Sequence, residues 1–206
     1  MSRLLLVRHG DTEGNSAERY WGHTDVKLSA SGRRQAELLR QRLAAEKIDA
    51  IYASDLERAT VTAQTIAAGH GREVITLPDL REINFGELEG LNFTEVGKQY
   101  PEVARLWRER SLSLRYPGGE SIQELNNRVS QFRRRLEKHN AGETVLIVAH
   151  SATLRLLMCQ LLGLPPQHWW QFRLDLASLS ELGTYPGGAI LNLLNDVCHL
   201  EGGKPG

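Results

Sequence analysis

The sequence predicts an α/β protein of three layers, α/β/α, in which helices cover both faces of a mostly parallel central sheet with one antiparallel edge. Residues 4–7 and 145–149 are unbroken apolar runs, typical of central parallel strands. Helical patterns alternate with these and with two shorter strand patterns. Apolar segments at 172–182 and 189–200 flank a Tyr-Pro-Gly-Gly turn and predict a β-hairpin that closes the sheet.

Composition predicts one domain over residues 1–206, because a chain of 206 residues that is 41% hydrophobic can bury one substantial core. Lysine plus arginine equals aspartate plus glutamate at 25 each, so no global field attracts nucleic acid or an anionic membrane. No apolar run is long enough to span a bilayer, and the first residues form a strand pattern instead of a signal peptide, so we expect a cytoplasmic protein. Cys159 and Cys198 lack metal-ligand spacing and are expected to be buried thiols.

The first half of the chain is expected to continue from its opening strand into a polar loop, 10–27, that could wall a pocket. An amphipathic stripe predicts a helix over 31–46, and a short strand follows at 48–53. Ser54 and Glu57 have the spacing of a capping box, which predicts that a second helix begins there.

The middle of the chain is expected to hold a third strand at 73–77 and an acidic loop at 78–92. A helical pattern over 94–110 should break at Pro101, because proline cannot continue a helix but suits its first turn. A second capping-box spacing, Ser121 with Glu124, predicts the start of a strongly amphipathic helix.

Two strands of the predicted sheet each deliver a histidine at the carboxyl end, His9 and His150. If the strands are neighbours, these histidines come together at the edge where open α/β sheets bind ligands. A neutral imidazole is a good phosphoryl acceptor, because water can cleave the phosphorylated ring.

This chemistry needs cations around the transferring oxygens and a proton donor for the leaving alkoxide. Arg8 and Arg58, with His150, can supply the first, and Glu82 the second. Glu87 and Glu89 lie in the same acidic loop and are alternative proton donors.

Five short motifs follow one another between residues 3 and 160. They are Arg8-His9-Gly10, Ser54-Asp55-Leu56-Glu57-Arg58-Ala59, the acidic segment 80–90, Pro117-Gly118-Gly119-Glu120-Ser121, and Val148-Ala149-His150-Ser151. Their order resembles that of the histidine phosphatase superfamily, whose founding branch is cofactor-dependent phosphoglycerate mutase.

The resemblance implies a phosphoglycerate mutase-like fold and a phosphohistidine intermediate, with no metal and no other cofactor. It puts the nucleophile on His9 and the acid/base on Glu82. The phosphate-binding residues that it implies are Arg8, Asn15, Arg58, His150 and Ser151. Asn15 would contact the phosphoryl group or the loop above it.

Departures from the family pattern bear on substrate choice. Gly14 stands where many relatives carry a bulky aromatic residue, and Ser151-Ala152 replaces a glycine pair, so both sites could change the pocket width. We expect residues 91–116 to form a helical lid and Trp169-Trp170 to anchor a turn in the core. The candidates for specificity are Tyr20, Trp21, Gly22, Trp107 and Arg108.

Rival functions can be weighed on the same residues. A zinc hydrolase could use two histidines and a glutamate, but Arg8 and Arg58 would repel a divalent ion. A binding protein that has lost catalysis should have lost at least one of the charged or reactive site residues. All five of these residues are present: Arg8, His9, Arg58, Glu82 and His150. Phosphoglycerate mutases resemble one another in an Arg-His-Tyr-Gly run after the acid/base, which here is Ile83-Asn84-Phe85-Gly86, so a phosphatase is favoured.

The expected partner is a small-molecule phosphate ester, bound by a monomer or homodimer. The acidic segment 80–90 and the Pro-Gly-Gly-Glu-Ser turn resemble the branch that holds α-ribazole phosphatases of cobalamin biosynthesis, broad-specificity phosphatases and metal-independent phosphoserine phosphatases. The aromatic and cationic residues of segment 91–116 favour α-ribazole 5′-phosphate, with phosphoserine and sugar phosphates as alternatives.

Overall fold

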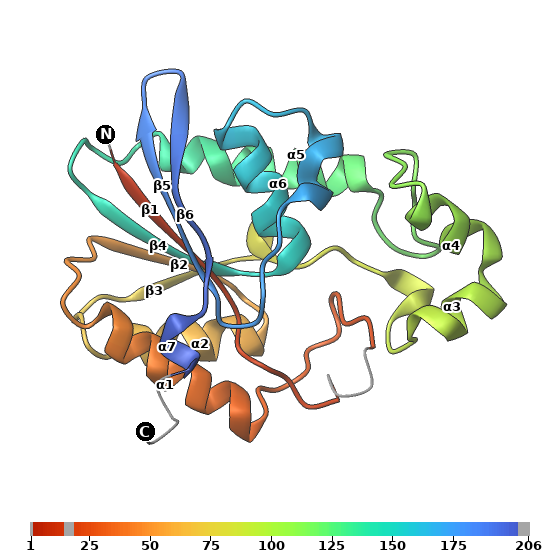
Figure 1. Cartoon of the computed structure of the whole chain (residues 1–206), viewed down its shortest axis with the longest axis horizontal. Coiled ribbons are helices and arrows are strands. Elements are labelled where there is room, and N and C mark those ends of the chain that lie inside the picture. Colours follow the sequence, from red (N-terminus) through yellow and green to blue (C-terminus); the bar gives the residue numbers. More distant parts are fainter. Residues whose placement is uncertain (1, 15–18, 202–206) are drawn as a thin grey trace.

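The computed structural model describes residues 2–14 and 19–201 and shows a six-stranded sheet between two layers of helices (Figure 1). The strand order is β3-β2-β4-β1-β5-β6. The first four strands in this order pair in parallel, whereas β5 and β6 are antiparallel and form one edge. The predicted fold class is therefore confirmed. The strands are β1 (Arg3–Arg8), β2 (Ala50–Ser54), β3 (Val74–Leu77), β4 (Thr144–Ala149), β5 (Leu179–Tyr185) and β6 (Gly188–Asp196).

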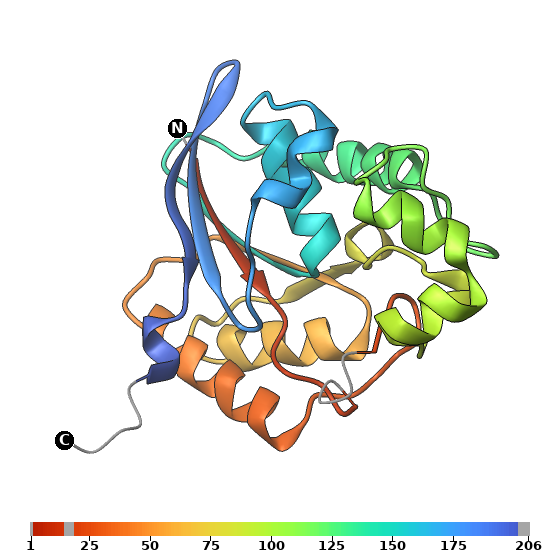
Figure 2. The same cartoon turned by 45° about the vertical axis from the view of Figure 1, so that its right-hand side comes forward.

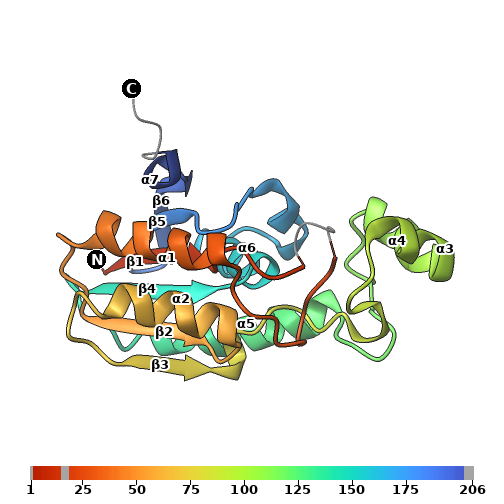
Figure 3. The same ribbon diagram turned by 90° about the horizontal axis from the view of Figure 1, so that it is seen from below.

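Helices cover both faces of the sheet, as the view from below shows (Figure 3). One face carries α1 (Ala30–Leu43), α2 (Glu57–Ala67) and α7 (Cys198–Glu201), and the other carries α5 (Ile122–Leu136) and α6 (Ser151–Leu161). Alternate side chains of β1 serve the two cores, because successive strand residues point to opposite faces. Leu4 and Leu6 pack under α5 and α6, and Leu5 and Val7 pack against α1 and α2.

Two shorter helices, α3 (Phe93–Gln99) and α4 (Pro101–Arg108), stand to one side of the sheet, away from the β5–β6 hairpin (Figure 2). Their junction confirms the predicted break, since Pro101 is the first residue of α4. Within residues 2–14 and 19–201 the chain also forms three 3₁₀ turns: Pro78–Leu80, Gly86–Leu88 and Pro166–Gln171.

The two capping-box predictions have different outcomes. Ser121 and Glu124 form the reciprocal pair at the start of α5, as predicted. Ser54 and Glu57 do not form such a pair. Ser54 is fully buried as the last residue of β2. The helix α2 begins at Glu57, and the residue before it, Leu56, provides no side-chain cap. The carboxylate of Asp25, from the distant polar loop, accepts the Glu57 backbone N–H at 2.7 Å instead.

The carboxyl-terminal predictions also need correction. The hairpin begins only at Leu179, because residues 172–178 are irregular and carry the loop that faces Arg8. The second arm ends at Asp196, and the residues after it form α7 against α1. Cys159 is buried as expected, but Cys198 is exposed, since it lies on the outer side of this short helix.

A close backbone crossing fixes the path of the chain after β1. Residues 10 and 11 pass over the first turn of α1, where a β-carbon on Gly32 would lie 1.9 Å from the carbonyl oxygen of Asp11. A β-carbon on Gly10 would lie 2.7 Å from the Gly32 oxygen. Both contacts are with backbone, which cannot rotate away, so glycine is required at the crossing.

Gly32→Ala should therefore destabilise the protein by about 1–3 kcal/mol, since the new methyl group overpacks a backbone contact. Gly97→Ala is the matched control, because Gly97 is also helical and has no atom within 4 Å of its added β-carbon. The control should be neutral or more stable by up to about 1 kcal/mol. Urea unfolding measures both values, and equal stability of the two variants would contradict the crossing.

Candidate active site

The carboxyl ends of β1 and β4 bring His9 and His150 together. The two strands are parallel neighbours, and Arg8 of β1 pairs with Ala149 of β4, so the next residue of each strand is a histidine. The imidazole centroids lie 4.9 Å apart. The structure thus juxtaposes the two histidines at the sheet edge where ligands bind in open α/β folds.

His9 is held as a neutral imidazole with a defined tautomer. Its Nδ1 lies 2.7 Å from the carbonyl oxygen of Gly10. A carbonyl can only accept, so Nδ1 carries the proton and Nε2 keeps a free lone pair. Burial, and then the charges of Arg58 and Arg8, lower the pKa of His9 well below the ordinary value of 6.5. The His9 imidazole is therefore neutral at neutral pH, with its Nε2 unprotonated.

Arg58 lies in the first turn of α2 and is almost fully buried. It donates to the carbonyl oxygens of Thr24 at 2.9 Å and Gly22 at 2.6 Å, and its Nε donates to Nδ1 of His150 at 3.3 Å. Because His150 Nδ1 accepts, its Nε2 carries the proton and is left as a buried donor without a partner among the described residues. Burial, followed by the charge of Arg58, also lowers the pKa of His150.

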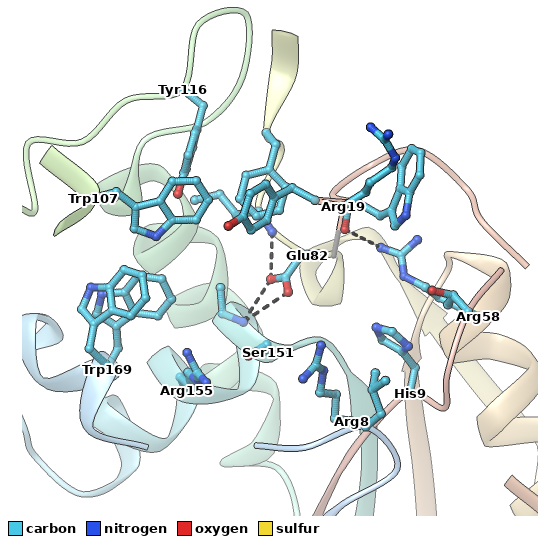
Figure 4. A pocket seen from close by; sticks show the side chains of 18 residues that line it. Arg8, His9, Arg19, Arg58, Glu82, Trp107, Tyr116, Ser151, Arg155 and Trp169 are labelled. Atoms are coloured by element: carbon cyan, nitrogen blue, oxygen red, sulfur yellow. Dashed lines mark hydrogen bonds between the residues drawn. The ribbon is translucent and has the colours of Figure 1, made fainter. Parts of the chain in front are cut away.

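Two more guanidinium groups point into the same space (Figure 4). Arg8 donates through Nη1 to the carbonyl oxygen of Leu174 at 2.8 Å, and its Nε is buried without a partner in the described parts of the chain. Arg155 lies one helical turn after Ser151 on α6, and its Nε is unpartnered in the same sense. Buried cationic donors with unused N–H groups are what an anion requires.

Glu82 faces these cations from the loop after β3 (Figure 4). Its carboxylate accepts backbone N–H groups of Ile83 at 3.0 Å and of Ala152, in the first turn of α6, at 3.1 Å. The side chain is 8% exposed and lines the pocket. Neither alternative acid lines this pocket: Glu89 binds the backbone N–H groups of residues 22–24, and Glu87 accepts the Tyr100 hydroxyl.

Arg8, His9, Arg58, Glu82 and Arg155 line one cavity of about 240 Å³. His150 is fully buried beside His9 and is not among the lining residues. Ser151 lines it at the start of α6, next to Ala152. Seven aromatic side chains form much of the remaining wall: Tyr20, Trp21, Phe85, Trp107, Tyr116, Trp169 and Trp170. Arginine side chains thus line one part of the cavity and aromatic side chains another. Such a cavity suits a phosphate ester with a larger organic part.

Some predicted specificity residues lie in this wall and others do not. Tyr20, Trp21 and Trp107 line the cavity. Gly22 does not, because its carbonyl is bound to Arg58 and it has no side chain to offer. Arg108 is also absent from the lining, since its guanidinium lies over the ring of Phe93 at 5.4 Å. Asn15 lies outside the described residues.

The sequence did not indicate that the 3₁₀ turn Pro166–Gln171 contributes to the site. Trp169 is buried as expected for a core anchor, but it also lines the cavity beside Trp170, their ring centroids 4.3 Å apart. The 3₁₀ turn of residues 166–171 packs against α6 and carries both rings to the cavity. Arg155 was detectable in principle, because it lies four residues after Ser151 and so on the same helix face.

Within 2–14 and 19–201, histidine, cysteine, aspartate and glutamate side chains form no group of three that could hold a metal ion. In the same ranges, no helix combines the length and apolar character needed to cross a membrane.

Comparisons with known proteins agree with this geometry. The family model of the histidine phosphatase superfamily (branch 1) matches residues 4–197. Phosphoserine phosphatase 1 of Hydrogenobacter thermophilus is 38% identical over 97% of this chain and 95% of its own length. The adenosylcobalamin/alpha-ribazole phosphatase of Salmonella typhimurium is 34% identical over 94% of this chain and 96% of its own.

A similar fold is found among solved structures. The alpha-ribazole phosphatase of Shigella flexneri superimposes with a TM-score of 0.87 at 32% identity, and the match covers 94% of this chain and 96% of that one. The family match spans almost the whole sequence and includes every strand of the sheet except the first residue of β1. The chain therefore belongs to branch 1 of the histidine phosphatase superfamily and is a phosphoric monoester hydrolase.

Proposed function

We propose that the protein hydrolyses phosphomonoesters without a metal, through a phosphohistidine on His9. The observation that carries this proposal is the state of His9: a neutral imidazole whose unprotonated Nε2 adjoins the cationic cavity. Nε2 attacks phosphorus and forms an N–P bond while the ester P–O bond breaks. Arg8 and Arg58, with the Nε2–H of His150, stabilise the charge on the transferring oxygens.

In this scheme Glu82 is the acid and then the base. Its protonated carboxyl gives a proton to the leaving alkoxide in the first step. In the second step the carboxylate takes a proton from water, which attacks phosphorus, releases phosphate and restores His9. The orientation of Glu82 by the N–H of Ala152 supports this assignment, since it holds the carboxyl at the cavity wall.

The residues after Glu82 favour water over a second organic acceptor. Ile83 and Phe85 line the cavity with apolar side chains, where a mutase would need polar contacts to hold a phosphorylated product for its second transfer. We therefore favour a phosphatase over a phosphoglycerate mutase.

For the substrate we propose α-ribazole 5′-phosphate, a bulky nucleoside-like ester. The aromatic walls support this choice: Tyr20 packs against Trp107 with centroids 4.6 Å apart, and Trp169 packs against Trp170. Trp107 and Trp169 lie on the same side of the pocket in Figure 4. Aromatic surfaces of this kind hold planar rings by stacking. We propose residues 91–116, which contain α3 and α4, as the lid that carries Trp107.

Phosphoserine is the second candidate, and Arg155 is the observation in its favour. Arg155 lines the cavity and its Nε has no partner among the described residues, so its guanidinium could bind a substrate carboxylate. The similarity to a phosphoserine phosphatase at 38% identity supports the same alternative.

His9→Ala should lower turnover of 4-nitrophenyl phosphate by about 10³-fold or more, because it removes the proposed nucleophile. His70→Ala, in the turn after α2, is the control and should stay within about twofold of the parent. Released nitrophenolate measures both rates, with and without EDTA. Wild-type turnover in His9→Ala would contradict the nucleophile, and loss of turnover in EDTA would indicate a zinc hydrolase.

The depressed pKa of His9 predicts an imidazole that stays neutral when the solution is mildly acidic. A lowered pKa means that the proton binds only at lower pH, so His9 should not protonate as pH falls through 6.5. NMR titration of its ring protons in the free enzyme measures this. Arg58→Gln should raise the His9 pKa, since the Arg58 charge is one cause of the depression. A parent value at or above 6.5 would contradict the electrostatic account.

The substrate is tested by kcat/KM across α-ribazole 5′-phosphate, O-phosphoserine and glucose 6-phosphate, because specificity is a ratio of these values. We expect α-ribazole 5′-phosphate to be preferred. A preference for phosphoserine above about tenfold, or roughly 1.4 kcal/mol, would overturn this assignment. In that case Arg155→Gln should lower kcat/KM for phosphoserine by about 10-fold or more, since it removes a charged hydrogen-bond partner, and 4-nitrophenyl phosphate turnover should change less.

A further inference from the structure

Arg128 of α5 donates hydrogen bonds to backbone carbonyl oxygens of the segment that ends in Glu82. Its Nη1 donates to the carbonyl oxygens of Arg81 at 2.8 Å, Asp79 at 3.0 Å and Pro78 at 3.5 Å. Its Nη2 donates to the carbonyl oxygen of Glu82 at 3.1 Å. One guanidinium therefore binds four carbonyls within five consecutive residues, an arrangement that requires the flat fork of arginine.

Glu120 sets the orientation of this guanidinium. Its Oε1 accepts from Arg128 Nε at 3.0 Å, and its Oε2 accepts from Nη2 at 2.8 Å, a bidentate pair. The two side chains are only 17% and 20% exposed. Burial works to raise the pKa of Glu120, but the hydrogen bonds and charge of Arg128 hold it below its ordinary value. Glu120 is thus ionised at neutral pH.

Glu120 also belongs to the Pro-Gly-Gly-Glu-Ser turn, which the proposed chemistry does not use. This turn docks on the acidic loop: Oε2 of Glu120 accepts the Asn84 N–H at 2.9 Å, and the Glu120 N–H donates to the Asn84 carbonyl at 2.9 Å. A β-carbon on Gly119 would lie 2.2 Å from that same carbonyl oxygen. The turn therefore binds the backbone after Glu82, and Arg128 binds the backbone that leads to Glu82.

Arg128 does not itself line the cavity. Its contact with Glu82 is to the backbone carbonyl, whereas the Glu82 carboxylate binds the N–H groups of Ile83 and Ala152. Its contacts can therefore affect the reaction through the position of the Glu82 backbone. The charge of Arg128 also lowers the pKa of His150, but it is the smallest of the charge effects on that histidine.

We propose that Arg128, oriented by Glu120, is a positioning residue that holds the Glu82 carboxyl where it can protonate the leaving oxygen. This inference rests on the proposed role of Glu82 as general acid. A general acid acts only within hydrogen-bond reach of the atom it protonates, and a displacement of about 1 Å can cost on the order of 100-fold in rate. Four carbonyl contacts from one rigid group restrict such displacement.

Leaving-group dependence separates this role from simple support of the fold. An alkoxide leaves only with a proton from the acid, whereas nitrophenolate leaves largely without one. Both ester types form the same phosphohistidine, so kcat/KM reports the step that the acid assists. The test therefore compares 4-nitrophenyl phosphate with the best alkyl phosphate of the panel above.

Arg128→Gln should lower kcat/KM for the alkyl ester by about 10- to 100-fold and for the aryl ester by less than about threefold, because only the acid is misplaced. Glu120→Gln should also lower kcat/KM more for the alkyl than for the aryl ester, but by a smaller factor. Arg128→Lys should not recover the activity on the alkyl ester, since lysine lacks the forked guanidinium. Added to Glu82→Gln, Arg128→Gln should cost no more than about twofold further, the non-additivity of residues that act together.

Arg3→Gln is the matched control. Arg3 also bridges two carboxylates, Glu46 and Glu181, but at the opposite end of the sheet. It should lower the unfolding temperature without changing the alkyl-to-aryl ratio. If Arg128→Gln fails to fold, Glu120→Gln and Arg128→Lys carry the same test.

If the Arg128 and Glu120 variants lose kcat/KM equally for the alkyl and the aryl ester, the alkyl-to-aryl ratio is unchanged, as in Arg3→Gln. That result would overturn the positioning role of Arg128 while leaving Glu82 as the acid. Equal loss of both esters in Glu82→Gln itself would instead show that the proposed acid is wrong, and the inference would fall with it.

Discussion

The site depends on the parallel pairing of β1 with β4. This pairing sets two imidazoles side by side at the end of two strands whose apolar residues are buried, with Arg8 and Arg58 around them. A one-residue shift in register would send each histidine to the opposite face, so the apolar runs that fix the register also fix the chemistry. The surrounding cations and the burial keep both imidazoles neutral, which leaves one ring able to accept a phosphoryl group and the other able to donate a hydrogen bond.

The arrangement is costly in the absence of an anion. Nε atoms of Arg8 and Arg155 and Nε2 of His150 are buried donors without partners in the described ranges, and each such group opposes folding. Backbone carbonyls of Thr24, Gly22 and Leu174 offset part of this cost. A bound phosphoryl group would satisfy the remaining donors. Stability and anion binding therefore compete here, as expected where charges are preorganised for a reaction.

Local patterns predicted most of the fold, because the strands are continuous apolar runs and the Pro101 break and the Ser121 cap are decided by neighbouring residues. What the sequence did not predict depended on distant parts of the chain. Asp25, and not Ser54, accepts the first N–H of α2, and Arg108 lies over Phe93 and outside the cavity lining. The buried Trp169 also reaches the cavity beside Trp170, which follows from how segment 166–171 packs on α6. Arg155 and Arg128 were missed because a charged residue on a helix is usually solvated, and only the packed structure shows which ones turn inward.

The central claim is that His9 carries the phosphoryl group between the ester and water. The most direct measurement is rapid quenching in alkali, which preserves phosphohistidine, during turnover of 4-nitrophenyl phosphate, followed by mass spectrometry of the peptide that spans residues 4–19. The account predicts a phosphorylated His9 that forms and decays at rates sufficient for turnover and is missing in His9→Ala. Turnover at the same rate with no phosphate on His9, or with phosphate on another residue, would contradict it.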